Sequence, residues 1–210
     1  MFNRKAVSIA ALALGMAASA PLFAATAADA NQPSVVIVHG AFADGSDWAK
    51  VIPLLQAKGV KVQAVQNGLN SLADDVAATR RAIGNQAGKV VLVGHSWGGT
   101  VITEAGADSK VAGLVYVAAF APDAGQSTEE VGKDYAPAPG IGKLVADANG
   151  YLSLPAEALA SDFAQDVPAA QARVMAATQG PIKATAFAER TRWRRGRASR
   201  RGSSSARTTG

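Results

Sequence analysis

A serine flanked by glycines lies near the middle of the chain. Residues 94–98 read Gly-His-Ser-Trp-Gly, with Ser96 at the centre. The apolar run 90–93 precedes them and a helical pattern follows, so we expect a strand, a tight turn and a helix. Such a turn exposes the serine hydroxyl, which can attack a carbonyl carbon once a base has taken its proton. The pattern therefore predicts nucleophilic acyl-transfer chemistry at Ser96.

Two backbone N–H groups are expected to stabilise the oxyanion that such an attack creates. The Trp97 N–H directly follows the serine. The Ala41 N–H lies in the loop that follows the first expected strand, 34–38. Preorganised donors of this kind stabilise the developing negative charge. The residues expected to shape the two turns are His39, Gly40, Gly94, His95, Gly98 and Gly99.

The base that Ser96 would need is not evident, because the chain has two histidines. His39 belongs to the first loop, where a structural role is the simpler interpretation. His95 adjoins Ser96, and neighbouring side chains on such a turn point apart. Asp123, just after the fourth expected strand, is a weak candidate for the triad acid, and an exposed loop carboxylate is the simpler interpretation. The sequence thus predicts a nucleophile and an oxyanion hole without the acid and the histidine of a triad.

Alternating strands and helices must position these residues. Parallel βαβ units in a doubly wound, mostly parallel α/β sheet are the expected result. The core, residues 31–121, has strands expected at 34–38, 60–65, 90–93 and 111–120, and helices expected at 47–58, from Ser71, and at 97–107. Prolines and glycines then separate short helical pieces over 122–188, which predicts a helical cap inserted over the sheet edge.

The first 27 residues have the pattern of a secretory signal peptide. Arg4 and Lys5 precede a small apolar run, and Ala-x-Ala sites allow cleavage after Ala27 or Ala30. We therefore expect an exported protein, periplasmic or secreted, with no stable membrane anchor after cleavage. The chain has no cysteine, so no disulfide can stabilise it.

The motifs together resemble a small-esterase branch of the α/β-hydrolases, which includes plant methyl-ester esterases, hydroxynitrile lyases and secreted bacterial relatives. The resemblance runs from about residue 33 to 188 and rests on Val-Ile-Val-His-Gly-Ala at 36–41, Trp48, Gly-His-Ser-Trp-Gly-Gly at 94–99 and Leu-Val-Tyr-Val-Ala-Ala-Phe at 114–120. It implies Ser96 as nucleophile, Ala41 and Trp97 as oxyanion donors, a small ester substrate, and neither cofactor nor metal. It also implies a later acid and histidine, which this sequence lacks, and hence a fold without its last strands.

The last segment, 189–210, differs in kind. It holds eight arginines and one glutamate, a net charge of +7, whereas residues 6–188 carry a net charge of −4. With Trp193 as its single large apolar residue, it is expected to be disordered. A basic tail could bind nucleic acid or anionic lipid, but an exported protein rarely meets nucleic acid, and no such partner is expected. This segment could be a native tail, a remnant of cloning, or the product of a shifted reading frame.

A shifted reading frame would explain both the tail and the missing residues. Suppose that the serines use TCN codons, where N is any base. The frame that starts at the third base of each codon then reads NTC at the three codons across 202–205. NTC encodes only Phe, Leu, Ile or Val. One back-translation of 191–210 reads AVAAWKGKPSWFIVSANDG in that frame. This is an apolar strand followed by an acid, as the fold requires.

Three functions follow from these observations. The leading interpretation is an esterase-type serine hydrolase that works through an acyl-enzyme and is inactive or crippled as written. A small-molecule-binding protein without catalysis is the first alternative. A truncated product without function is the second, and it would aggregate through an exposed sheet.

Overall fold

The computed structural model describes residues 32–193 and a short strand at 202–204. The expected signal peptide lies outside the described residues, as do positions 194–201 and 205–210 of the expected tail. Among the residues that the structure describes, no helix is long and apolar enough to cross a membrane.

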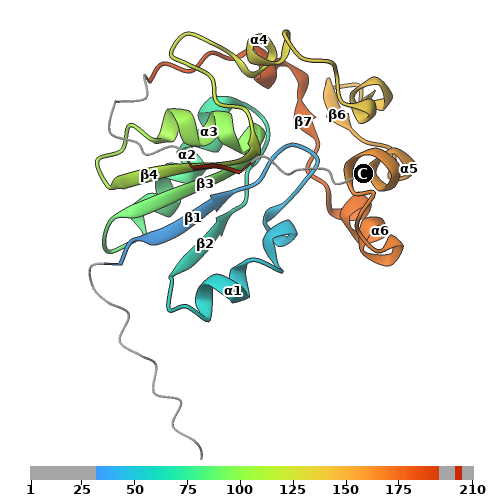
Figure 1. Ribbon diagram of the computed structural model, residues 1–210. Helices are drawn as coiled ribbons and strands as arrows, with labels where there is room; N and C mark the ends of the chain where they lie inside the picture. The colour runs from blue at the N-terminus through green and yellow to red at the C-terminus, as the bar shows by residue number, and fades with distance from the viewer. Residues whose placement is uncertain (1–31, 194–201, 205–210) are drawn as a thin grey trace, which may run out of the picture.

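A five-stranded parallel sheet forms the centre of the molecule, in the order β2-β1-β3-β4-β8 (Figure 1). The parallel pairing confirms the expected α/β class. Runs of β-branched and other apolar residues explain the two central strands β1 and β3, because a parallel strand is typically buried on both faces. The strands are β1 (Ser34–Val38), β2 (Val62–Val65), β3 (Val90–Ser96), β4 (Val111–Ala119) and β8 (Gly202–Ser204).

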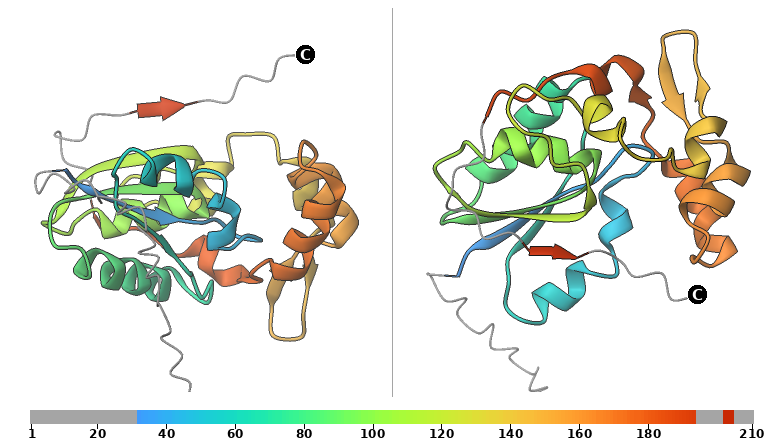
Figure 2. Two further views of the ribbon diagram at one scale, coloured as in Figure 1. Left: turned by 90° about the horizontal axis from the view of Figure 1, so that it is seen from below. Right: turned by 45° about the horizontal axis from the view of Figure 1, so that its top comes forward.

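Two helices cover one face of this sheet. They are α2 (Leu72–Gly84) and α3 (Trp97–Ala105), and Leu92 of β3 and Val101 of α3 are fully buried between the layers. The Ser71 side chain begins α2 by accepting a hydrogen bond from the Asp74 N–H at 3.0 Å, as the sequence predicts. The much shorter α1 (Ile52–Gln56) lies on the opposite face (Figure 2).

The single helix expected over 47–58 is wrong. The structure has a 3₁₀ turn, η1 (Gly45–Trp48), and then the separate helix α1. Pro53 lies in the first turn of α1, where its missing N–H is tolerated, and it could not lie inside one long helix. Asp44 caps η1 by accepting from the Ser46 N–H at 2.6 Å.

The chain between β4 and residue 189 forms a layer of short helices together with a small antiparallel sheet, β5-β6-β7 (Figure 1). The sequence did not predict this sheet, because strands of two or three residues carry no periodic pattern. Its elements are α4 (Thr128–Gly132), η2 (Pro139–Lys143), β5 (Val145–Ala146), β6 (Tyr151–Ser153), α5 (Ala156–Ala158), the π-helical turn η3 (Leu159–Phe163), α6 (Ala169–Thr178), β7 (Ile182–Lys183) and η4 (Ala184–Ala188).

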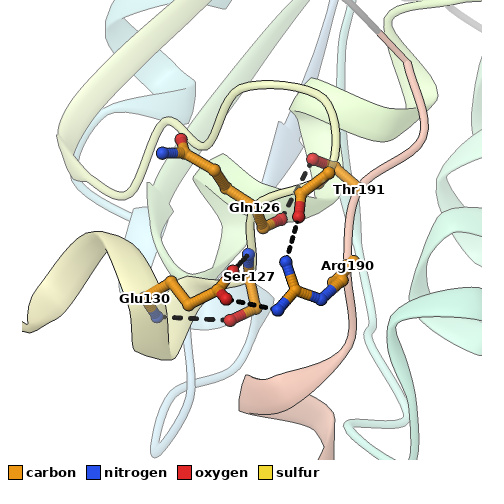
Figure 3. A network of polar contacts seen from close by, with 6 residues as sticks. Gln126, Ser127, Glu130, Arg190 and Thr191 are labelled. Atoms are coloured by element: carbon orange, nitrogen blue, oxygen red, sulfur yellow. Dashed lines mark hydrogen bonds and ion pairs between the residues drawn. The ribbon is translucent and has the colours of Figure 1, made fainter.

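The two ends of this layer are joined by a polar network, which we call the cap stem, residues 123–130 and 189–191 (Figure 3). The Thr191 N–H donates to the Gln126 carbonyl at 3.0 Å, and the Gly125 N–H donates to the Thr191 carbonyl at 2.7 Å. Arg190 pairs with Glu130, whose carboxylate also accepts from the N–H of Ser127. The stem therefore fixes the layer at its base.

The expectation of disorder from residue 189 onward needs correction for its first five residues. Thr191 is buried, and the Glu104 carboxylate of α3 accepts from the backbone N–H groups of Arg192 (2.6 Å) and Trp193 (3.0 Å). The composition of the tail could not predict this order, because the groups that bind residues 189–193 lie elsewhere in the chain. Further on, β8 pairs in parallel with β4.

Candidate active site

Ser96 lies at the junction of β3 and α3. Its backbone has φ 50° and ψ −122°, a positive φ that non-glycine residues rarely adopt. The Ser96 carbonyl accepts from the Phe120 N–H at 3.2 Å, which ties the turn to the end of β4. A strained residue of this kind is retained where the surrounding structure fixes it, commonly at functional sites. The strand, turn and helix that the motif predicts are all present.

Close backbone contacts explain the glycines around this turn. A Cβ atom on Gly94 would lie 2.6 Å from the carbonyl oxygen of Gly98, and one on Gly98 would lie 2.3 Å from that of Val38. A Cβ atom on Gly99 would lie 2.1 Å from the carbonyl oxygen of Phe120. Only glycine fits at these three positions, so the turn can pack directly on the ends of β1 and β4.

The loop after β1 meets the serine. A Cβ atom on Gly40 would lie 2.8 Å from Cβ of Ser96. Ala41, the next residue, is buried, and its N–H has no hydrogen-bond partner among the residues that the structure describes. Trp97 is the first residue of α3, so its N–H has no carbonyl one turn earlier to bind. The structure thus brings both expected oxyanion donors to segments that adjoin Ser96.

His39 is held by backbone groups at both ring nitrogens. Its Nε2 accepts from the Asn67 N–H at 2.9 Å, and its Nδ1 lies 2.8 Å from the Gly40 carbonyl oxygen. A neutral ring with its proton on Nδ1 satisfies both contacts. The ring is buried, so His39 orders the first loop and is not placed as a base for Ser96.

The other two titratable candidates have different surroundings. His95 is partly buried, and desolvation, followed by the nearby His39, lowers its pKa. Its Nδ1 lies close to Gly40, 3.4 Å from where a Cβ atom would stand. Asp123 is exposed, and its backbone belongs to the cap stem, where its carbonyl accepts from the Thr191 hydroxyl at 2.8 Å.

A buried carboxylate, which sequence reasoning missed, lies behind the site. Asp75 of α2 is fully buried, and its Oδ2 accepts from the Trp97 indole N–H at 2.8 Å. Burial raises the pKa of Asp75, and the bonds from Trp97 and from the Leu69 amide oppose that rise. The signal available in the sequence was an acid on the apolar side of α2, three residues after Leu72.

The end of the layer of short helices packs on the same tryptophan. The Phe187 ring meets the Trp97 ring edge-on, with centroids 5.6 Å apart. The Phe42 N–H, in the first loop, donates to the Gly180 carbonyl at 3.2 Å. Over the described residues, no three histidine, cysteine, aspartate or glutamate side chains are grouped to hold a metal ion. The candidate site therefore consists of Ser96, the expected donors Ala41 and Trp97, and the Asp75 and Phe187 side chains that contact Trp97.

Known hydrolases are similar to this chain in sequence. The chain is 37% identical over 110 residues to methylesterase 7 of Arabidopsis thaliana. The aligned region covers 44% of this chain and 42% of that protein. It is 33% identical over 98 residues to a pyrethroid hydrolase of Sphingobium wenxiniae, 40% and 35% of the two chains. The aligned regions thus span less than half the length of these relatives.

Solved structures share the fold. An extracellular α/β-hydrolase from a Paenibacillus species, described as a homologue of tobacco salicylic acid binding protein 2, superposes with a TM-score of 0.64 at 24% identity. The superposition covers 77% of this chain and 71% of that one. The alpha/beta hydrolase family matches residues 35–201, most of the sequence. The chain therefore belongs to the alpha/beta hydrolase family, and its relatives include esterases.

Proposed function

We propose that Ser96 is the nucleophile of an esterase site for a small carboxylic ester, with the Ala41 and Trp97 amides as its oxyanion hole. The observation that carries the proposal is the strained Ser96 backbone at the β3–α3 junction, with Gly40 packed against it. The names of the relatives, a methylesterase and a pyrethroid hydrolase, support an ester as substrate. The chemistry needs neither metal nor cofactor.

The reaction would proceed in two steps. The Ser96 oxygen bonds to the ester carbonyl carbon as its proton leaves to a base, and the carbonyl oxygen becomes an oxyanion that accepts from the two amides. Collapse of this intermediate breaks the bond to the alkoxy group, which leaves with a proton as the alcohol. Water then attacks the acyl-enzyme, releases the acid and restores the serine.

We further propose that the chain as printed performs this reaction poorly. Both ring nitrogens of His39 are taken by backbone groups, and His95 is the other histidine. Without a base, the oxyanion hole and substrate binding alone retain a rate acceleration on the order of 10³-fold over the reaction in water. The same observation favours the alternative, a protein that binds small molecules without turning them over.

The position of β8 supports the reading-frame hypothesis, which we keep as a proposal. Its residues, Gly202–Ser204, pair with Val115–Val117 of β4. Glycine and serine are poor strand formers, whereas the shifted frame encodes Phe, Leu, Ile or Val across these positions. In the fold that the hypothesis assumes, an acid encoded just after such a strand would lie at the carboxyl end of the sheet, the edge that carries Ser96. An acid there would supply what the site lacks.

Ester hydrolysis by purified protein tests the proposed function. We expect slow release of p-nitrophenol from p-nitrophenyl acetate, above the rate in buffer, and its loss in Ser96→Ala. Ser109→Ala is the matched control, because Ser109 is exposed and its backbone carbonyl, not its hydroxyl, binds Lys89. Binding of the ester or its acid without any Ser96-dependent release would favour the non-catalytic alternative.

Sequencing the coding DNA from codon 180 onward tests the frame proposal. We expect a second frame that encodes an apolar strand at 202–204, an acid shortly after it and a later histidine. A coding region that lacks such a frame would contradict the proposal and leave the basic tail as native sequence.

A further inference from the structure

We propose that Asp75 is a positioning residue that supports both arms of the oxyanion hole, one through each of its carboxylate oxygens. The inference rests on the proposed function, since it concerns the amides of Trp97 and Ala41. Asp75 lies on α2 and belongs to neither of the loops that carry those amides.

The first arm is direct. Oδ2 of Asp75 accepts from Nε1 of Trp97 at 2.8 Å, and both side chains are fully buried. The indole is therefore fixed from one side by a carboxylate and from another by the edge-on ring of Phe187. The Trp97 ring and the Trp97 N–H belong to one residue at the start of α3, so holding the ring on two sides restricts the movement of the Trp97 Cα and of the backbone that carries the N–H.

The second arm runs through the loop before α2. Oδ1 of Asp75 accepts from the Leu69 N–H at 2.9 Å. Leu69 has φ 57°, so this backbone is strained and needs a partner to hold it. Two residues earlier, Asn67 binds His39 twice, through its backbone N–H to Nε2 and through its side-chain amide to the His39 carbonyl at 3.0 Å.

His39 then completes the connection to Ala41. Its Nδ1 lies 2.8 Å from the Gly40 carbonyl, and this peptide group includes the Ala41 N–H. The orientation of that carbonyl sets the orientation of the N–H, because the peptide group is planar. The chain of contacts from Asp75 through Leu69, Asn67 and His39 thus ends on the second donor.

A carboxylate suits this position because both of its oxygens accept. Asp75 meets two N–H donors, whereas an asparagine offers one acceptor and one NH₂ group. In Asp75→Asn one of the two contacts must therefore place a donor against a donor. A buried polar contact left unmade is costly, so the loop or the indole would move.

The test compares Asp75→Asn with Asp74→Asn. Asp74 is the adjacent residue on the same helix, but its side chain is exposed. Each protein is treated with p-nitrophenyl acetate, and the rate of Ser96 acylation is followed by intact mass. Amide signals of Ala41 and Trp97 and the Trp97 indole signal are followed by ¹H–¹⁵N NMR without any substrate.

We expect Asp75→Asn to slow acylation about tenfold, less than the 10²–10³-fold typical of losing an oxyanion donor outright. We also expect all three NMR signals to move in Asp75→Asn and none to move in Asp74→Asn. A purely structural role would lower the melting temperature but leave acylation of the folded protein and the Ala41 amide unchanged, and that result would overturn the proposal.

If Asp75→Asn does not fold, Trp97→Phe replaces it. This variant removes the indole donor and leaves the Leu69 contact, so we expect slower acylation with an unshifted Ala41 amide. Acylation as fast as in the native chain would contradict the first arm. Should the native chain be acylated no faster than Ser96→Ala, the proposed function fails, and the NMR signals still decide whether Asp75 positions the two amides.

Discussion

At the scale of single residues, the site is defined by backbone contacts more than by side-chain chemistry. Ser96 adopts its positive φ because glycines on both sides let β1, β4 and α3 approach to contact distance. These contacts can be tested by replacing two glycines, one in a crowded position and one in an open position. The contacts also explain why the motif can be recognised in the sequence, because no other residue fits at its glycine positions.

Gly98→Ala is expected to destabilise the protein strongly. The added Cβ would lie 2.3 Å from the Val38 carbonyl oxygen, and backbone cannot move away cheaply. We expect the free energy of unfolding to fall by about 3 kcal/mol in urea titrations. Gly84→Ala is the matched control, since nothing lies within 4 Å of its added Cβ. It should be neutral or stabilising by up to about 1 kcal/mol; equal losses in both variants would contradict the contact argument.

The stability of the folded protein should depend on pH in part because of His95. Desolvation and the neighbouring His39 lower the pKa of His95 in the folded state, so the unfolded chain binds its proton more readily. The stability that the neutral ring contributes is present above the unfolded value of about 6.5 and is lost as pH falls toward the lowered folded value. Melting temperatures measured downward from pH 7.5 should therefore fall less in His95→Asn than in the native chain. A parallel decline in both would show that His95 is not responsible.

At the scale of elements, the cap stem ties the two ends of the layer of short helices to each other. The Thr191 hydroxyl donates to the carbonyls of Asp123 (2.8 Å) and Gln126 (3.2 Å), and Thr191 itself is buried. Thr191→Val keeps the shape and removes the donor. We expect a loss of about 1 kcal/mol and faster hydrogen exchange at the Gly125 and Thr191 amides.

The control for the stem is Thr185→Val, at an exposed position of η4. It should leave exchange at the stem unchanged. If Thr191→Val also leaves exchange unchanged, the stem is held by its backbone pairing alone, and the hydroxyl has no part in it.

The elements differ in how well the sequence predicted them. The strands of the core were predicted because runs such as 90–93 are short, apolar and rich in β-branched residues, which favours a buried strand over a helix. The helix expected over 47–58 failed because Pro53 fits only a first turn. Asp75 could not be singled out as support for the site, because its partner Trp97 lies 22 residues away in the sequence. Contacts between distant segments leave no local pattern, and so the support of the site could not be predicted.

At the scale of the whole molecule, the two faces of the sheet are unequally covered. Val90 and Leu92 point toward α2 and α3 and are fully buried, whereas Val91 and Val93, on the other face, are partly exposed. On that face the short α1 has an exposed Leu54, at 65% of its surface. The described residues therefore present apolar surface on the α1 side.

This surface predicts self-association. Leu54→Glu should lower light scattering and the concentration dependence of sedimentation without changing the melting temperature, because Leu54 contributes little buried area. Val174→Glu, at an equally exposed position on α6 (60%), is the control for added charge. Identical improvement in both variants would assign the effect to charge and not to the α1 face.

Locating the acyl group is the most direct test of the account. The native chain is incubated with p-nitrophenyl acetate, digested, and its peptides are analysed by mass spectrometry, with Ser96→Ala treated alongside. We predict an acyl group on Ser96 that accumulates ahead of any modification of the exposed serines and lysines, because the oxyanion hole and the elbow act on this hydroxyl alone. Acylation spread over surface residues, with Ser96 unmodified or no faster than Ser109, would contradict the assignment of Ser96 as the nucleophile.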